Sequence, residues 1–202
     1  MKKNIQAVLF DLDGVLVDSL DAWYYAFCDA LKHFGKKKIS YEVFKKNFGS
    51  SAEEEISTIF KGVSMTELVS FYNLAFKSRS EFVRLNSEAI PTLEKVKELK
   101  MKTCIITNST RPITMEFLDN FRIKKYFDEI VTMEDVKNGK PAPDMVLKAC
   151  SLLGIRPADA IVVGDTINDM LAGKSAGCTT IGYKIKGDFK IEELGEIINF
   201  IK

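Results

Sequence analysis

Carboxylic acids directly follow two apolar runs in this 202-residue chain. Asp11 and Asp13 come after one run, and Asp165 and Asp169 come after another. Residues i and i+2 of a strand point to the same side, so the first two carboxylates can share one space. Four converging carboxylates would form an all-oxygen site, which suits Mg²⁺ better than zinc or copper. A zinc site is nearly excluded, because His33 is the only histidine and no two cysteines are closely paired.

Each of these acids has an ordinary structural interpretation when it is taken alone. A single aspartate at such a position could equally cap a helix or lie in a turn, and Asp169 alone could be a surface residue of a helix. Two acidic clusters, both at the ends of apolar strands, favour a shared site, because ligands gather at strand ends in α/β sheets.

Hydroxyl groups and one cation accompany the acids. Thr107, Asn108 and Ser109 follow another apolar run and precede a predicted helix, where a hydroxyl and free backbone N–H groups can cradle an anion. A plain helix N-cap is the alternative for this segment. Lys140 lies in a stretch stiffened by Pro141 and Pro143. A lone loop lysine is usually solvated, but this one could offset the acids and bind a phosphoryl oxygen.

The elements that must position these residues alternate along the chain. Near-continuous apolar runs suit strands buried on both faces of a parallel sheet, and helical segments lie between them. Pro112 and the pair Pro143–Asp144 mark two helix starts. The alternation predicts an α/β fold with a doubly wound, Rossmann-like parallel sheet. Its strands are expected at residues 7–10, 103–106, 130–132, 160–163 and 179–183.

One segment, residues 18–85, interrupts this alternation with helical patterning rich in aromatic residues. Two sequences of the capping-box type mark helix starts in it, at Ser51 to Glu54 and at Ser64 to Glu67. We therefore expect an α/β core made of residues 1–17 and 86–202, and a small α-helical cap domain at 18–85, inserted after the first strand. We call residues 18–85 the insert.

Composition excludes several functional classes. The 29 basic and 28 acidic residues leave a net charge of +1, which gives no electrostatic footprint for nucleic acid or an anionic membrane. No apolar run approaches the ~20 residues that cross a bilayer. The N-terminus is a poor signal peptide, and the four cysteines are widely separated, so we expect buried free thiols and a cytoplasmic location.

Four segments, taken in order, resemble the four motifs of the haloacid dehalogenase superfamily. The insert resembles the cap of the phosphoglycolate phosphatase and β-phosphoglucomutase branch. The motif-like segments span almost the whole chain, and they are 11–19, 107–109, 140–144 and 164–169.

The resemblance implies a role for each matched residue. Asp11 would be the nucleophile that forms an aspartyl phosphate, and Asp13 would protonate the leaving oxygen and then activate water. Thr107 would hold a phosphoryl oxygen, and Lys140 would steady the nucleophile and the transferring group. Mg²⁺ would bind Asp11, the backbone carbonyl of Asp13, and Asp165, with Asp169 bound directly or through water.

The acid at position 13 separates this chain from dehalogenases and phosphonatases of the superfamily. The resemblance therefore implies a Mg²⁺-dependent phosphatase of a small phosphorylated metabolite, with phosphoglycolate the first candidate. Arg84 and Arg111 could touch an anionic substrate, although a surface position is at least as good an interpretation for each. The expected substrate-binding residues are Asn108, Ser109, Gly49, Ser50 and Arg111, with Phe48 and Ser51 in the same cap loop.

Other functions stay open at this point. A mutase like β-phosphoglucomutase would share the first step, and a pyrophosphatase or nucleotidase would be a variant of the phosphatase. A binding protein that keeps the fold without turnover is the alternative from another class. We expect no nucleic-acid or membrane partner, and a monomer or homodimer.

Overall fold

The computed structural model describes residues 4–49 and 52–201. In this part of the chain, six parallel strands form one sheet in the order β5-β4-β1-β6-β7-β8. This arrangement confirms the predicted α/β fold. The strands are β1 (Ala7–Phe10), β4 (Lys102–Ile106), β5 (Glu129–Val131), β6 (Ala160–Gly164), β7 (Thr179–Tyr183) and β8 (Phe189–Ile191).

Helices cover both faces of the sheet, because alternate strand residues point to opposite sides. Val8 and Phe10 of β1 join an apolar cluster with helices of one face, whereas Ala7 and Leu9 join the cluster of the other face. The doubly wound arrangement is thus confirmed. The first face carries α5 (Ala89–Glu98) and α6 (Arg111–Asn120), and the second carries α7 (Asp144–Leu153) and α8 (Ile167–Ala176).

Local start signals place two of these helices as predicted. Pro112 lies in the first turn of α6, where its missing N–H leaves no helical bond unmade. Pro143 is the N-cap of α7, and Asp144 begins the helix. The described chain also contains five 3₁₀ segments, one in the insert and four in the core: Ser80–Phe82, Lys124–Tyr126, Met133–Asp135, Pro157–Asp159 and Leu194–Phe200.

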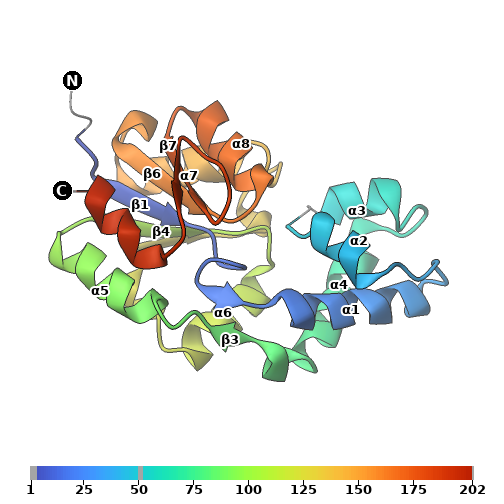
Figure 1. The fold of residues 1–202 in the computed structure, drawn as a ribbon. Coiled ribbons are helices and arrows are strands. Elements are labelled where there is room, and N and C mark those ends of the chain that lie inside the picture. The colour runs from blue at the N-terminus through green and yellow to red at the C-terminus, as the bar shows by residue number, and fades with distance from the viewer. Residues whose placement is uncertain (1–3, 50–51, 202) are drawn as a thin grey trace.

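The insert is helical, and its helices gather beside the sheet rather than on it (Figure 1). Phe27, Phe44, Phe60 and Leu68 form a separate apolar core within it. The capping box at Ser64 is present, whereas Ser51 lies outside the described residues. The helices are α1 (Leu20–His33), α2 (Tyr41–Lys46), α3 (Ala52–Thr58) and α4 (Met65–Lys77).

Two short strands lie where the chain enters and leaves the insert. β2 (Val17–Asp18) pairs antiparallel with β3 (Arg84–Leu85). The pairing brings the two chain crossings together, and Phe76 of the insert also packs against Phe117 of α6 in the core. The division into domains at residues 17 and 85 stays a prediction that agrees with this pairing.

Two other features follow from the packing. Cys104, Cys150 and Cys178 are buried free thiols, as expected, and Cys28 is half-buried. Within the described residues, no helix combines the length and the apolar character that a membrane crossing demands.

Candidate active site

Three neighbouring strands of the sheet end at the site. Asp11 follows β1, Thr107 follows β4 and Asp165 follows β6, and β1 lies between the other two. The Asp11 N–H donates to the Val163 carbonyl at 2.9 Å, which fixes the backbone of Asp11 against β6. The chain winds to opposite sides of β1 at this point, and such switch points are where α/β sheets bind ligands.

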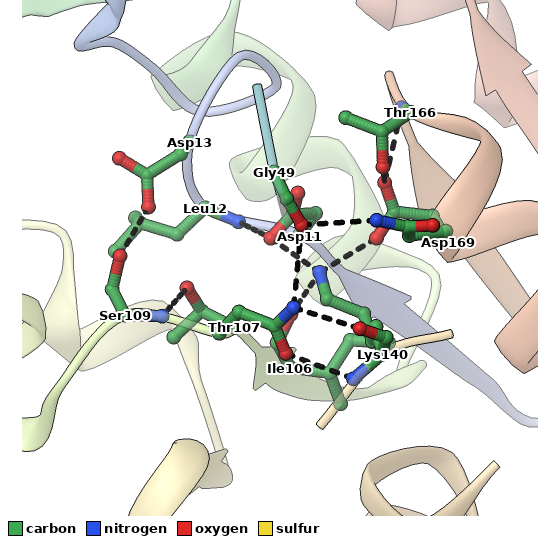
Figure 2. A network of polar contacts seen from close by, with 12 residues as sticks. Asp11, Leu12, Asp13, Gly49, Ile106, Thr107, Ser109, Lys140, Thr166 and Asp169 are labelled. Carbon is green, nitrogen blue, oxygen red and sulfur yellow. Dashed lines mark hydrogen bonds and ion pairs between the residues drawn. The ribbon is translucent and has the colours of Figure 1, made fainter. Parts of the chain in front are cut away.

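A buried lysine connects two of the acids. Lys140 Nζ lies 2.8 Å from Asp11 Oδ1 and 2.6 Å from Asp169 Oδ1, and it donates to the Ile106 carbonyl at 3.1 Å (Figure 2). Burial lowers the pKa of Lys140, but attraction to the two carboxylates outweighs burial and raises that pKa above its ordinary value. Lys140 is therefore a fixed positive charge.

The loop that carries Lys140 is held by Asn108. The Asn108 amide donates to the Lys140 carbonyl at 3.0 Å, and its oxygen accepts from the Lys140 N–H at 2.8 Å. A Cβ at Gly139 would lie 2.7 Å from this Asn108 oxygen, so the close approach depends on glycine. Asn108 thus positions the lysine loop.

The acids remain under electrostatic strain despite Lys140. Burial and the neighbouring Asp169 raise the pKa of Asp11 well above its ordinary range, against the opposing effect of Lys140. The same two causes raise the pKa of Asp165 to about 8. Oδ1 of Asp165 is buried and accepts no hydrogen bond from the described residues. This orphaned oxygen is a ligand atom without a partner.

The donor set fits a divalent cation. Carboxylate oxygens of Asp11, Asp165 and Asp169 all lie within 4.8 Å of one another. Hard oxygen ligands suit Mg²⁺, and a cation would relieve the repulsion that raises the pKa values of Asp11 and Asp165. Gly14, at φ +80°, makes room for this group, since a Cβ there would lie 1.9 Å from Asp165 Oδ2.

Asp169 is fixed by its own helix terminus. Its Oδ2 accepts from the Thr166 hydroxyl at 2.6 Å and from the Thr166 N–H at 3.1 Å, which forms a capping box at the start of α8. Its Oδ1 faces Lys140. Asp169 therefore bridges the helix terminus and the lysine.

Asp13 is held by three donors from both parts of the protein. Ser19 Oγ at 2.5 Å and Trp23 Nε1 at 3.0 Å donate to Oδ1, and Ser109 Oγ at 2.7 Å donates to Oδ2. Thr107 Oγ1 in turn accepts from the Ser109 N–H at 3.0 Å. The position of Asp13 therefore depends on the first helix of the insert as well as on the core.

A cavity of about 330 Å³ lies between the core and the insert, with the catalytic candidates at its floor. The floor is formed by Asp11, Asp13, Thr107, Ser109 and Lys140. The insert supplies the opposite wall, which we call the roof. Apolar side chains dominate the roof, among them Trp23, Phe27, Ile39, Phe44, Phe48 and Ile59.

The structure brings together some of the expected substrate-binding residues. Asn108, Ser109 and Gly49 line the cavity, and the Gly49 carbonyl accepts from the side-chain amides of Asn108 at 3.3 Å and Asn168 at 3.1 Å. Phe48 also lines the cavity, whereas Ser50 and Ser51 lie outside the described residues.

The two arginines are placed elsewhere. Arg111 is not among the residues that line the cavity. Its guanidinium forms an ion pair with Asp135, which lies in the segment after β5. The Arg84 guanidinium donates to the carbonyls of Glu81 and Val83 instead. Neither supplies a positive charge to the cavity.

Sequence reasoning missed several residues of this site. Ser19 and Trp23 hold Asp13, and Glu55 and Tyr72 form a polar pair in the roof. Ser19 lies in the first motif-like segment. The spacing of Trp23, Glu55 and Tyr72 carries no local signal, since packing between helices brings these side chains to the cavity. Thr166 did have a signal, because Thr166-x-x-Asp169 has the form of a capping box.

Known proteins are similar to this chain in sequence and in fold. The family model of haloacid dehalogenase-like hydrolases matches residues 8–183. Pyrophosphatase PpaX of Bacillus velezensis is 31% identical over 210 aligned residues, which cover 98% of this chain and 96% of the relative.

Solved structures have the same architecture. A predicted phosphoglycolate phosphatase from Haemophilus somnus 129PT matches with a TM-score of 0.80 at 23% identity, over 98% of this chain and 99% of that one. β-Phosphoglucomutase from Clostridium difficile matches with a TM-score of 0.83 at 23% identity, over 96% of this chain and 93% of that one. The fold is thus that of the branch which the motifs resemble. On the strength of the family model and the Bacillus relative, the chain belongs to the haloacid dehalogenase-like hydrolases.

Proposed function

We propose that this protein is a Mg²⁺-dependent phosphatase that hydrolyses a small phosphorylated metabolite through a phosphoenzyme formed on Asp11. The observation that carries the proposal is the position of Asp11. It lies at the carboxyl end of β1, beside the fixed charge of Lys140 and the orphaned oxygen of Asp165, on the floor of the cavity. Charge neutralisation and positioning are what phosphoryl transfer needs from a protein.

The hydrogen bonds of Asp11 leave one oxygen for nucleophilic attack. Oδ1 faces Lys140 Nζ and accepts from the Leu12 N–H at 2.7 Å, and no described residue donates to Oδ2. In the first step, Oδ2 bonds to phosphorus while the bond from phosphorus to the leaving oxygen breaks. In the second step, water replaces Asp11 at phosphorus and inorganic phosphate leaves.

Asp13 is the proposed acid and base for these two steps. It gives a proton to the leaving oxygen and later takes one from the attacking water. Three donors occupy three of the four lone-pair sites of its carboxylate, so one site on Oδ2 is left for the proton. Two of those donors are Ser19 and Trp23 at the start of the insert, so movement of the insert as a cap would control Asp13.

Asp11, Asp165, Asp169 and the backbone carbonyl of Asp13 would hold Mg²⁺. When bound, the ion would neutralise charge on the transferring phosphoryl group. Thr107 and Ser109 would contact phosphoryl oxygens from the carboxyl end of β4, which lies on the other side of β1 from Asp165.

Phosphate release from a panel of phosphate esters tests the proposal, with Mg²⁺ and with EDTA. We expect release to require Mg²⁺ and to fall by at least about 1,000-fold in Asp11→Asn, because the amide is not a nucleophile. Asp119→Asn is the matched control, since Asp119 is exposed at the end of α6. Release that persists in Asp11→Asn would overturn the proposal.

Pyrophosphatase activity is the second candidate, and the name of the Bacillus velezensis relative favours it. The panel therefore contains pyrophosphate beside phosphoglycolate, nucleotides and sugar phosphates. A mutase would isomerise a sugar phosphate with little phosphate release. We propose a cytoplasmic location and a monomer or homodimer on the grounds given by the sequence.

A further inference from the structure

In its described part, the roof of the cavity lacks the positive charge that an anionic leaving group needs. Among the described residues that line the cavity, Lys140 is the only basic one. Its Nζ already lies within 3.1 Å of three oxygens, those of Asp11, Asp169 and Ile106. The two undescribed residues at 50 and 51 are both serines, so their sequence adds no basic residue.

The roof contains a half-buried carboxyl group instead. Glu55 of α3 lines the cavity, and Tyr72 of α4 donates a hydrogen bond to its Oε2 at 2.7 Å. Tyr72 is held in turn, because its ring packs edge-on against Trp23 with 5.7 Å between centroids. Burial raises the pKa of Glu55 to about 7, in spite of the hydrogen bond from Tyr72.

One oxygen of Glu55 is left for a ligand. Within the described chain, the carboxyl group of Glu55 accepts its hydrogen bond from Tyr72 at Oε2, and Oε1 has no donor. The surrounding roof is apolar and aromatic, with Phe27 and Phe44 among its residues. A carboxyl oxygen in apolar surroundings selects a ligand that donates a hydrogen bond and rejects one that brings a negative charge.

We infer that Glu55, positioned by Tyr72, is a specificity-determining residue that selects phosphate esters whose leaving group is uncharged and carries a second hydroxyl. The hydroxyl would donate to Glu55, and the hydrocarbon part would pack on the aromatic roof. A leaving group that ends in a carboxylate or a phosphate would face Glu55 without a counter-charge. The inference rests on the proposed phosphatase function and disfavours phosphoglycolate and pyrophosphate.

A matched pair of substrates measures this selection directly. 2-Hydroxyethyl phosphate and phosphoglycolate have the same skeleton and differ in a terminal hydroxyl against a terminal carboxylate. We expect kcat/KM of the wild-type protein to favour the hydroxyl compound by at least about tenfold at pH 8, because like charges at close range are strongly disfavoured. Pyrophosphate is measured beside them.

Substitution of Glu55 separates selection from folding. Glu55→Gln keeps an oxygen for Tyr72 and removes the charge, so kcat/KM for phosphoglycolate should rise while that for 2-hydroxyethyl phosphate falls. Glu55→Lys should reverse the preference. Glu42→Gln is the control, because Glu42 is exposed on α2 of the same insert and does not line the cavity. A merely structural role would lower both kcat/KM values together and leave their ratio unchanged.

The outcomes also distinguish this inference from the function on which it rests. p-Nitrophenyl phosphate reports whether the catalytic groups work. Activity toward it, combined with a wild-type preference for phosphoglycolate or pyrophosphate, or with an unchanged ratio in Glu55→Gln, would overturn the inference alone. Absence of Asp11-dependent release from every compound would overturn the proposed function and the inference with it.

Discussion

Asp11, Asp165 and Asp169 carry more negative charge at the floor of the cavity than Lys140 balances. Lys140 lies between Asp11 and Asp169, and it is 3% exposed. The pKa of Asp165 is still raised, to about 8, by burial and by Asp169. A divalent cation would complete this balance, and the protein has preorganised the oxygens for it.

Removal of the lysine should therefore affect stability as well as chemistry. Without it, Asp11 and Asp169 are like charges in a buried space, and breaking a buried pair costs about 3 kcal/mol. We expect Lys140→Met to lower the free energy of unfolding by this amount in EDTA and to lower kcat by at least about 100-fold. Urea unfolding measures the first effect, with exposed Lys148→Met as the control. Equal stability of the two variants would contradict this account.

Gly14 gives a second test at single-residue scale. A Cβ at position 14 would lie 1.9 Å from Asp165 Oδ2, so Gly14→Ala must displace this carboxylate. We expect Mg²⁺ affinity, measured by isothermal titration calorimetry, to fall at least about tenfold. Gly35→Ala is the matched control, because Gly35 also has positive φ (+62°) but has no atom within 4 Å of its Cβ position. The prediction fails if both variants bind Mg²⁺ like the wild type.

Pairs of secondary-structure elements determine which substrate groups the site can accept. α3 and α4 bring Glu55 and Tyr72 together from positions 17 residues apart, and α1 brings Trp23 to Asp13. The insert therefore contributes to both ends of the cavity. Its helices hold the proposed acid in place and also form the roof that would contact the leaving group.

The half-buried carboxyl of Glu55, which the roof desolvates, makes stability depend on pH. Repulsion from Glu54 also raises the pKa of Glu55, and the hydrogen bond from Tyr72 lowers it. The charged groups that line the same cavity from the core are Asp11, Asp13 and Lys140. Because the pKa rises from 4.5 to about 7 on folding, the folded state holds a proton that the unfolded state loses. The stability that this proton gives is complete below pH 4.5 and is lost as the pH rises through 7.

Glu55→Gln removes this titration. Relative to the wild type, the variant should gain about 2 kcal/mol between pH 5 and pH 8, because it never has to ionise in the apolar roof. Urea unfolding at the two pH values measures the difference, and Glu42→Gln should show no such gain. If the two proteins differ in free energy of unfolding by the same amount at pH 5 and at pH 8, the raised pKa of Glu55 is contradicted.

At the scale of the whole molecule, the cavity lies between the core and the insert. The insert has an apolar cluster of its own, but Ala22, Ala26 and Phe76 of its helices also join the cluster of the core. The chain crosses between the two parts at β2 and β3. Four of the metal and phosphate candidates belong to the core alone: Asp11, Thr107, Asp165 and Asp169. A metal bound by the core should therefore stabilise the folded molecule wherever the insert is placed.

Thermal unfolding tests this consequence. At a Mg²⁺ concentration of 100 times its Kd, folding gains about 2.7 kcal/mol, which corresponds to a rise in Tm of about 5–10 °C for a chain of this size. We expect Asp165→Asn to abolish most of the rise, whereas Asp119→Asn should keep it. A rise of equal size in Asp165→Asn would place the ion elsewhere.

The sequence by itself determined the parallel sheet and the place of the acids. Buried parallel strands are apolar throughout, so their runs stand out, and their carboxyl ends meet at one edge of the sheet. This geometry is enough to bring Asp11 and Asp165 together. β8 was missed, because it has only three residues and two of them are exposed, so it gives no apolar run.

Only the tertiary structure decided the environment of these residues. The sequence predicted Arg111 as a substrate ligand, but in the fold it forms an ion pair with Asp135. Asn108, also predicted as a substrate ligand, holds the loop of Lys140 through two hydrogen bonds. Glu55 and Tyr72 meet only because two helices of the insert pack against each other. Strand ends follow from local pattern and sheet geometry, whereas contacts between helices depend on packing over long separations in the sequence. That packing determines the chemistry of the roof.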